Sequence, residues 1–248
     1  MKKHLTYFLV LAILVLINSC STTDEAPLPD QPPAPLPDFS SAVFTNSTSI
    51  TNQYYGPGAD QIYVYQGGEV GTAPEEEIVI ERRQQTRQVM GITCIIHHDI
   101  VTLDGVVIED TDDWLAQDDA GNLWYMGEFV ENYHDDGTFA DNDGSWEAGV
   151  DDALPGYWMA ANPQTGESYM QEYLKDEAED YAEVVGFESV TIALGTYNNC
   201  LVTKDINPFE AGVHELKYYA PGIGFIKEEK FENEELVEVV ELVEIIDN

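Results

Sequence analysis

Alternation of apolar and polar residues is the feature of this chain that most constrains its fold. Read as an extended strand, Gln88–Leu103 would place Cys94 and Ile96 on one face and His97 on the other. Asp104-Gly105 follows between two β-branched runs, which is the favoured signal for a type I′ hairpin. We therefore expect half-buried strands joined by tight turns.

Turn signals recur through the rest of the chain at the spacing of an antiparallel meander. Little of the sequence after Phe39 repeats a helical period. The prediction is an all-β fold, an antiparallel meander curled into a half or full barrel, in one domain at 39–248. Its later strands are expected at Ser168–Leu174, Ala178–Phe187, Ser189–Leu194, Cys200–Asp205, His214–Tyr219 and Gly224–Phe231.

The C-terminal stretch Glu235–Ile246 carries two conflicting signals. Glutamate recurs at every third residue, a spacing near that of a helix, whereas valine and isoleucine favour an extended chain. Glutamates at this density would repel one another along an isolated helix. We expect a strand that forms a hairpin with Gly224–Phe231 across Glu232-Asn233-Glu234.

Acidic residues dominate the charge of the chain. Of its 248 residues, 47 are Asp or Glu and only 10 are Lys or Arg, which gives a formal net charge of −37. A field of that sign disfavours nucleic acid and anionic lipid headgroups as partners and leaves cations and cationic ligands. The hydrophobic content of 44% and the aromatic content of 11% indicate a globular chain rather than an acidic disordered one.

The N-terminus has the form of a bacterial export signal. Lys2 and Lys3 precede an apolar run, Leu5–Ile17, that is too short to span a bilayer at about 1.5 Å per residue. Residues 1–19 are therefore expected to be a signal peptide. Ile17-Asn18-Ser19-Cys20 resembles the lipobox of bacterial lipoproteins, which implies that Cys20 carries a lipid anchor. An ordinary signal peptide with an incidental cysteine is the alternative.

Two copies of Ala-Pro-Leu-Pro-Asp lie between Cys20 and Asp38 and exclude a helix or a central strand there. Residues 20–38 are expected to form a Pro-rich, acidic tether. The expected location is the bacterial cell envelope, with the lipid anchor in a membrane. Ser21, directly after the anchor, is similar to the residue found at this position in outer-membrane lipoproteins.

Cys94 and Cys200 are the only thiols left once Cys20 is acylated. Because the envelope is an oxidising compartment, a disulfide between Cys94 and Cys200 is expected. Two buried free thiols are the alternative. A catalytic Cys94 is disfavoured, because Ile92 and Ile96 on the same face would raise its pKa.

No residue pattern points to a catalytic, cofactor or metal site. The chain lacks Cys-x-x-Cys, His-Glu-x-x-His, Gly-x-Ser-x-Gly and phosphate-binding glycine motifs. Adjacent His97 and His98 on a strand would point to opposite faces and could not share one metal ion. The acidic turns fail as an EF-hand loop. A looser calcium site remains as an alternative to plain polar turns, with the carboxylates of Asp135, Asp136, Asp141 and Asp143.

Leu123–Tyr133 is unusual for an antiparallel strand, because apolar side chains would occupy both of its faces. Such a strand implies a second layer, a curled sheet around an apolar space, or an exposed recognition strip. The expected ligand-binding residues lie on this strand or in the broken sequence after it: Trp124, Met126, Trp146 and Trp158. The alternative is that these side chains fill the core.

Three blocks of sequence, Asp113–Glu128, Gly144–Gly149 and Lys217–Gly224, carry a resemblance to a known group. Together they are similar to an uncharacterised family of exported bacterial proteins and lipoproteins, over most of Asn52–Glu228. The resemblance implies no catalytic residue. Tyr54-Tyr55-Gly56-Pro57 departs from the usual Tyr-Phe-Pro-Leu pattern of that family. Lipoprotein carriers with curled antiparallel sheets are analogous at the level of the fold only.

The leading functional prediction is a lipid-anchored, non-enzymatic envelope lipoprotein that binds an apolar or mixed ligand within its curled sheet. The second hypothesis is a glycan hydrolase or carbohydrate-binding lipoprotein that uses aromatic platforms and carboxylates. Two carboxylates about 5 to 9.5 Å apart in an aromatic cleft would favour the hydrolase. The third hypothesis, a structural or partner-binding lipoprotein, would be favoured by an exposed apolar strip without a pocket.

Overall fold

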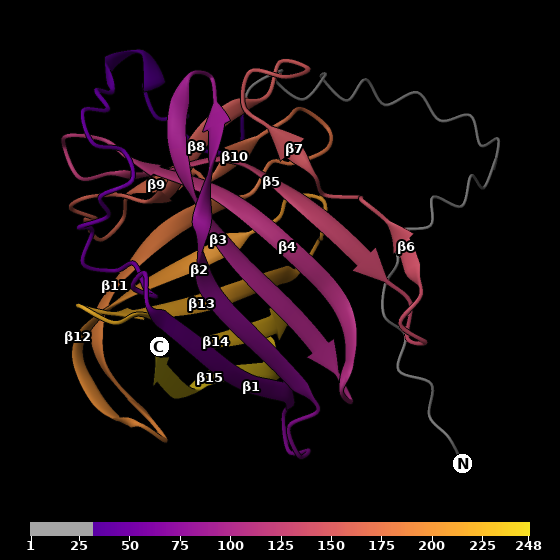
Figure 1. Cartoon of the computed structure of the whole chain (residues 1–248). Helices are drawn as coiled ribbons and strands as arrows, with labels where there is room; N and C mark the ends of the chain where they lie inside the picture. The colour runs from indigo at the N-terminus through magenta and orange to yellow at the C-terminus, as the bar shows by residue number, and fades with distance from the viewer. Residues whose placement is uncertain (1–31) are drawn as a thin grey trace, which may run out of the picture. The chain divides into compact units, whose positions relative to one another are not determined.

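A computed structural model describes residues 32–248 of the chain. The predicted signal peptide, Cys20 and most of the predicted tether lie outside the described residues. Within 32–248 the only helix is one 3-10 turn, η1 (Phe39–Ser41). The described part of the chain has no helix whose length and hydropathy would let it cross a bilayer. The remaining regular structure consists of β-strands (Figure 1).

Fifteen strands form one antiparallel sheet. In chain order they are β1 (Gln61–Glu69), β2 (Glu76–Val89), β3 (Ile92–Leu103), β4 (Val106–Gln117), β5 (Leu123–Tyr133), β6 (Phe139–Asp141), β7 (Trp146–Glu147), β8 (Leu154–Met159), β9 (Ser168–Met170), β10 (Glu172–Tyr173), β11 (Tyr181–Ile192), β12 (Gly195–Ile206), β13 (Val213–Ala220), β14 (Gly224–Glu232) and β15 (Glu235–Asp247). Their order in the sheet is β10-β8-β5-β4-β3-β2-β1-β15-β14-β13-β12-β11-β9, with β6 and β7 both paired to β5. Two meanders, β1 to β5 and β11 to β15, are thus joined through the β1–β15 ladder, and the predicted all-β meander is confirmed.

Left-handed turn residues determine where several strands end. Asp104-Gly105 has φ values of 51° and 80°, so the predicted type I′ hairpin joins β3 to β4. Met90-Gly91, with φ values of 49° and 79°, makes a second such turn. The strand predicted at Gln88–Leu103 therefore begins at Ile92, and its first residues belong to β2. The C-terminal hairpin turns at Asn233-Glu234, which confirms β15 as a strand paired with β14.

The strands predicted at Ala178–Phe187 and Ser189–Leu194 are one long strand, β11. The prediction of two strands was wrong because the chain bulges here instead of turning. The register with β12 shifts twice along β11, after Val184 and again after Glu188. Bulges bend a strand and increase its twist, so they help to curl this edge of the sheet.

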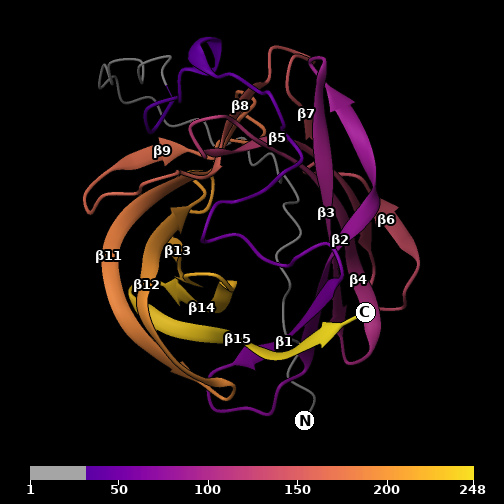
Figure 2. The same cartoon turned by 60° about the vertical axis from the view of Figure 1, so that its left-hand side comes forward.

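The sheet curls so that its two end strands, β9 and β10, are neighbours in the sequence. β9 pairs with β11 at one end, β10 pairs with β8 at the other, and Gln171 alone separates β9 from β10 in sequence. The single strand predicted at Ser168–Leu174 is therefore split. No ladder joins β9 to β10 in the described part of the chain, so the sheet is not a closed barrel. Figure 2 shows the two meanders facing each other across an interior.

The segment that precedes β1 covers one end of this curled sheet (Figures 1 and 2). Its Phe39 and Phe44 rings pack on Trp124, with centroid distances of 5.1 and 6.3 Å. Gln117 Oε1 accepts hydrogen bonds from the backbone N–H groups of Thr51 (2.7 Å) and Asn52 (2.8 Å). The segment is thus held by the core and by β4.

Part of the predicted tether belongs to the folded domain. Ala34 is buried, and the backbone N–H of Met170 donates a 3.1 Å hydrogen bond to the carbonyl oxygen of Pro35. The described part of residues 20–38 is therefore not a free spacer. Contact with β9 thus begins at Pro35, before the predicted start of the domain at Phe39.

Apolar side chains form two clusters on the inside of the sheet. The first lies beneath the N-terminal segment and includes Tyr54, Leu115 and Trp124. The second includes Tyr65 and Leu242, and it lies where the two meanders join. These clusters leave the remaining inward positions to polar side chains, which form the candidate site.

Candidate functional site

Strand register turns a set of acidic side chains toward the inside of the sheet. On β4, Asp113 pairs with His97 of β3 and with Glu128 of β5, and directly paired residues project from the same face. Asp99 shares that face with His97, two positions away. Leu115, two residues beyond Asp113, is fully buried in the first apolar cluster, so this face is the inner one.

A second set of charged side chains comes from the opposite meander. Lys217 on β13 pairs with Glu228 on β14. Its Nζ atom lies 3.1 Å from a carboxylate oxygen of Glu215, 3.6 Å from one of Asp205 and 3.7 Å from one of Glu228. Burial raises the pKa of Asp99, and the charge of Lys217 opposes that rise. The two sets therefore face a common interior, in which acids outnumber the lysine.

Three of these side chains form a compact group that we call the triad: His97, Asp99 and Asp113. One nitrogen and two carboxylate oxygens of the triad all lie within 4.8 Å of one another. The Tyr125 hydroxyl donates a 2.5 Å hydrogen bond to Asp113 Oδ1. The Tyr55 hydroxyl lies 3.4 Å from His97 Nδ1. The Asp99 carboxylate is half-buried.

Burial determines the charge state of the triad. It lowers the pKa of His97 to about 3, with a smaller contribution from His98, so the imidazole is neutral at pH 7. Burial, followed by the charge of Asp113, raises the pKa of Asp99 well above its usual value. Burial, followed by the charge of Glu128, does the same to the pKa of Asp113. Two carboxyl groups thus lie together, and Lys217, whose charge acts on Asp99, is itself paired with Glu215.

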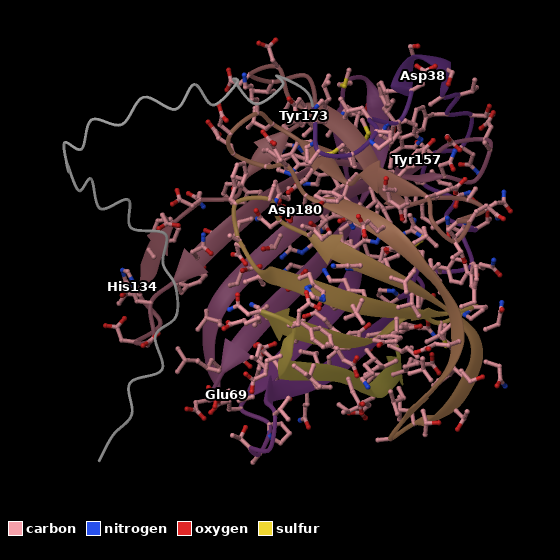
Figure 3. The ribbon with its side chains drawn as sticks, turned by 180° about the vertical axis from the view of Figure 1, so that it is seen from behind. Asp38, Glu69, His134, Tyr157, Tyr173 and Asp180 are labelled. Carbon is pink, nitrogen blue, oxygen red and sulfur yellow. The ribbon has the colours of Figure 1, made fainter. Side chains whose placement is uncertain are left out.

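The acidic face continues through Glu128, Glu172 and Asp180 toward the end of the sheet at β10. Trp146 Nε1 donates a 3.2 Å hydrogen bond to Glu128 Oε1. Glu172 is 7% exposed and its Oε2 atom has no hydrogen-bond partner; Oδ1 of Asp180, labelled in Figure 3, also has none. A buried polar atom left without a partner costs about 1 to 3 kcal/mol. Asp112 Oδ1 on the outer face is the third such atom in residues 32–248, so the oxygens of Glu172 and Asp180 are the two on the acidic inner face.

Burial, followed by the charge of Asp180, raises the pKa of Glu172 to about 8. Burial raises the pKa of Asp180 to about 7, although the charge of Lys217 opposes that rise. A cavity of about 240 Å³ opens beside Asp180, and its lining includes Asp205, Glu215, Lys217 and Lys230. Most of the lining is charged or polar and its carboxylates outnumber its lysines, which suits a small, hydrophilic, positively charged ligand.

A larger cavity, of about 690 Å³, lies beside β2 and the C-terminal residue Asn248. Its lining includes Asp60, Glu81, Arg82 and Arg83. Neither cavity has a Trp, Tyr or Phe side chain in its lining. The aromatic cleft with paired acids that would favour a glycan hydrolase is therefore absent from these two cavities.

The four predicted ligand-binding residues separate into two pairs. Trp124 and Met126 are fully buried in the core, and Trp124 Nε1 donates a 2.9 Å hydrogen bond to Asp118. Trp146 and Trp158 instead lie beside the acidic face. Their rings pack edge-on against the Tyr125 ring at centroid distances of 5.3 and 5.0 Å. The structure therefore brings Trp146 and Trp158 to the candidate site and places Trp124 and Met126 away from it.

Cys94 and Cys200 are both free thiols in the structure, so the predicted disulfide is not formed. Each thiol is fully buried, Cys94 in the first apolar cluster and Cys200 in the second. Burial raises the pKa of both thiols, that of Cys94 to about 12. The alternative prediction, two buried free thiols, matches the structure. A buried thiol with a raised pKa is a poor nucleophile.

The prediction that His97 and His98 point to opposite faces is confirmed. His98 Nε2 lies 2.9 Å from Asp110 Oδ1 and 2.8 Å from Arg83 Nη2. Arg83 also pairs with Asp112 at 2.7 Å. On the outer face, the acids beside His98 are thus paired with Arg83 and His98. The triad lies on the inner face of the same two strands.

The aspartates of the acidic turns accept hydrogen bonds from nearby groups of the same turns and strands and do not converge on one point. Asp141 Oδ1 accepts hydrogen bonds from Asn132 Nδ2 (2.9 Å) and from the backbone of Asp143 (3.2 Å), and Asp136 Oδ1 accepts from Thr138. The only group of potential metal ligands found within residues 32–248 is the triad. The looser calcium site considered from sequence has no support.

Sequence reasoning did not select the triad, Glu128 or Glu172. The available signal was His97-x-Asp99 on one strand face with several aspartates on the strand that follows the hairpin. With 47 acidic residues in the chain, that signal could not distinguish an inward carboxylate from a solvated one.

Comparison with solved structures gives two structural neighbours. No protein-family model and no curated protein matches the chain. A "putative exported protein with YmcC-like fold" from Bacteroides fragilis aligns with a TM-score of 0.45 and 14% identity, over 79% of this chain and 100% of that one. A "putative lipoprotein" from Parabacteroides distasonis aligns with a TM-score of 0.46 and 14% identity, over 79% of this chain and 99% of that one.

Proposed function

We propose that this protein is a lipid-anchored lipoprotein of the bacterial cell envelope that binds a small cationic ligand on the acidic inner face of its curled sheet. The observation that carries the proposal is Glu172, a carboxyl group that is 7% exposed and whose Oε2 atom has no partner. Native proteins seldom leave such an atom unsatisfied, so it marks a position that a ligand would complete. The apolar run before Cys20 supports export and anchoring.

A cation fits this interior better than the apolar ligand expected from sequence. The apolar part of the interior is filled, since Trp124 and Met126 are buried by other side chains. The polar part has an excess of carboxyl groups over the two ammonium groups of Lys217 and Lys230. A cation there would form charge-assisted hydrogen bonds or coordination bonds with groups that otherwise repel one another.

Calorimetric titration of the full-length protein tests the proposal. Spermidine and the chlorides of magnesium, calcium, manganese and zinc are titrated at 150 mM NaCl, which screens weak binding to the acidic surface. We expect at least one of these cations to bind at a single saturable site. Glu172→Gln should weaken that binding about tenfold, which corresponds to about 1.4 kcal/mol. Glu177→Gln, which removes an exposed carboxylate, should leave it unchanged.

Two results would contradict the proposal. One is equal loss of affinity in Glu172→Gln and Glu177→Gln, which would indicate a diffuse surface effect. The other is an apolar molecule recovered by organic extraction of the purified protein, together with no saturable cation binding. That second result would restore the ligand class expected from sequence.

A further inference from the structure

The triad has the composition and the spacing of a metal site. Metal-to-ligand distances of about 2.0 to 2.2 Å place two ligand atoms on one ion about 3 to 4.4 Å apart. The nitrogen of His97 and the oxygens of Asp99 and Asp113 all lie within 4.8 Å of one another. Small side-chain movements would therefore bring the three atoms onto one ion without moving the strands.

The strands and the neighbouring side chains orient these ligands. His97 and Asp113 are directly paired across the β3–β4 ladder, which fixes the separation of their backbones. Asp113 is 2% exposed and is held by the Tyr125 hydroxyl at 2.5 Å. Ligands of a metal site usually have outer hydrogen bonds of this kind. The Trp158 ring, 5.2 Å from the His97 ring, adds an apolar wall to one side.

Asp99 completes the ligand group on the inner face. Its half-buried carboxylate lies two positions from His97 on the same face of β3. The outer face differs in charge, because Asp112 pairs there with Arg83 at 2.7 Å, although the Asp112 Oδ1 atom has no hydrogen-bond partner.

We infer that His97, Asp99 and Asp113 bind a divalent first-row transition metal ion, such as Mn²⁺ or Zn²⁺. One imidazole and two carboxylates suit this class of ion, whereas Ca²⁺ takes six to eight oxygen ligands and Mg²⁺ prefers oxygen and water. The inference rests on the proposed function and deepens it, because it names the cation and places it on β3 and β4. Glu172 and Asp180 remain a separate part of the acidic face.

The test uses full-length protein that has been treated with a chelator and then dialysed. Mn²⁺ and Zn²⁺ binding is measured by calorimetry, and Co²⁺ is added as a spectroscopic probe, since its visible absorption reports nitrogen and oxygen ligation. We expect one ion per chain, a loss of affinity of about tenfold or more in His97→Gln and in Asp99→Asn, and loss of the Co²⁺ absorption band in both. Asp99→Asn replaces a half-buried carboxylate by an amide of nearly the same size, so it should fold even if His97→Gln does not.

The chain offers matched controls on the outer face. His98→Gln and Asp112→Asn change the same residue types at neighbouring positions of β3 and β4, and circular dichroism confirms that each variant is folded. Both should retain the affinity and the absorption band. Equal losses in the inner and outer variants would overturn the inference. Metal binding that is lost in Glu172→Gln but retained in Asp99→Asn would overturn it and leave the proposed function standing. Failure of every cation to bind would overturn both.

Discussion

Asp118 shows how much one buried acid contributes in this protein. It is 5% exposed, and its two oxygens accept four hydrogen bonds. Three come from the tight turn that follows, at Ala120 and Asn122, and the fourth comes from the indole of Trp124. The carboxylate therefore connects the β4–β5 turn to the centre of the first apolar cluster.

Asp118→Ala is expected to destabilise the protein by about 3 kcal/mol, because several buried donors would lose a charged acceptor. Urea denaturation followed by tryptophan fluorescence measures the change. Glu177→Ala, at an exposed position, serves as the control and should alter stability by less than about 0.5 kcal/mol. A similar stability for the two variants would show that water replaces Asp118 without cost.

A one-residue shift explains why the inner carboxylates could not be read from the sequence. In the hairpin turn, Leu103 pairs with Val106, and Thr102 pairs with Val107. That register, continued, would place Asp112 opposite His97. A bulge after Val101 moves the register by one, so Asp113 is opposite His97 instead. The opposite faces of His97 and His98 were predictable, but the choice between Asp112 and Asp113 was not.

At the scale of elements, the contact between β8 and the β9–β10 stretch completes the curl. Gly156 of β8 pairs with Tyr125 of β5, and a Cβ atom at Gly156 would collide with the carbonyl oxygens of Met170 and Gln171. No flexible side chain is available to move aside, because the obstructing atoms belong to the backbone. Only glycine permits the two ends of the sheet to approach this closely.

Gly156→Ala is therefore expected to cost about 2 kcal/mol or more and to loosen β10 from β8. Hydrogen exchange of the Glu172 and Tyr173 backbone amides measures the loosening, and urea denaturation measures the stability. Gly58→Ala is the matched control, since a Cβ atom there would approach only the flexible side chain of Gln61. Unchanged exchange in Gly156→Ala would mean that this end of the sheet tolerates a wider separation.

The elements themselves were largely predictable where periodicity and turn chemistry agreed. β5 was expected at Leu123–Tyr133 with both faces apolar, and the residues from Leu123 to Gly127 are indeed buried. Met90-Gly91 was missed as a turn because methionine is an uncommon residue at positive φ. The split between β9 and β10 depends on partners far away in sequence, which no local pattern encodes.

At the scale of the whole domain, the acidic interior makes stability depend on pH. Burial, followed in each case by a neighbouring carboxylate, raises the pKa of Glu172 and Glu228 to about 8 and that of Glu76 to about 7. In the unfolded chain these groups ionise at about pH 4. The folded chain therefore binds more protons between about pH 4 and 8, and the free energy of unfolding falls as the pH rises through that window.

We expect the melting temperature to be about 5 °C or more higher at pH 5.5 than at pH 8.5, as measured by circular dichroism. Surface carboxylates stay ionised across this range, so their mutual repulsion does not produce the effect. Glu172→Gln should reduce the difference between the two pH values, because the amide does not titrate. A melting temperature that is constant, or highest at pH 8.5, would contradict the assignment of these groups as buried acids.

The class of fold and its curl followed from alternation, hairpin signals and the doubly apolar strand β5, whereas the character of the interior did not. An apolar space was expected because Trp124 and Met126 lie on the second apolar face of β5, where a solvent-facing strand would carry polar residues. The N-terminal segment covers that face, since Phe39 and Phe44 pack on Trp124. Curvature arises from bulges such as those in β11, and bulges have little signature in a single sequence.

The ladder between β1 and β15 determines when folding of the sheet can be completed. Gln61 lies opposite Asp247, so the first strand of the sheet finds its partner in the fifteenth. A polypeptide synthesised from its N-terminus presents β1 long before β15. Pairing of such distant segments is slow to nucleate. The two meanders therefore stay unjoined until β15 has been synthesised.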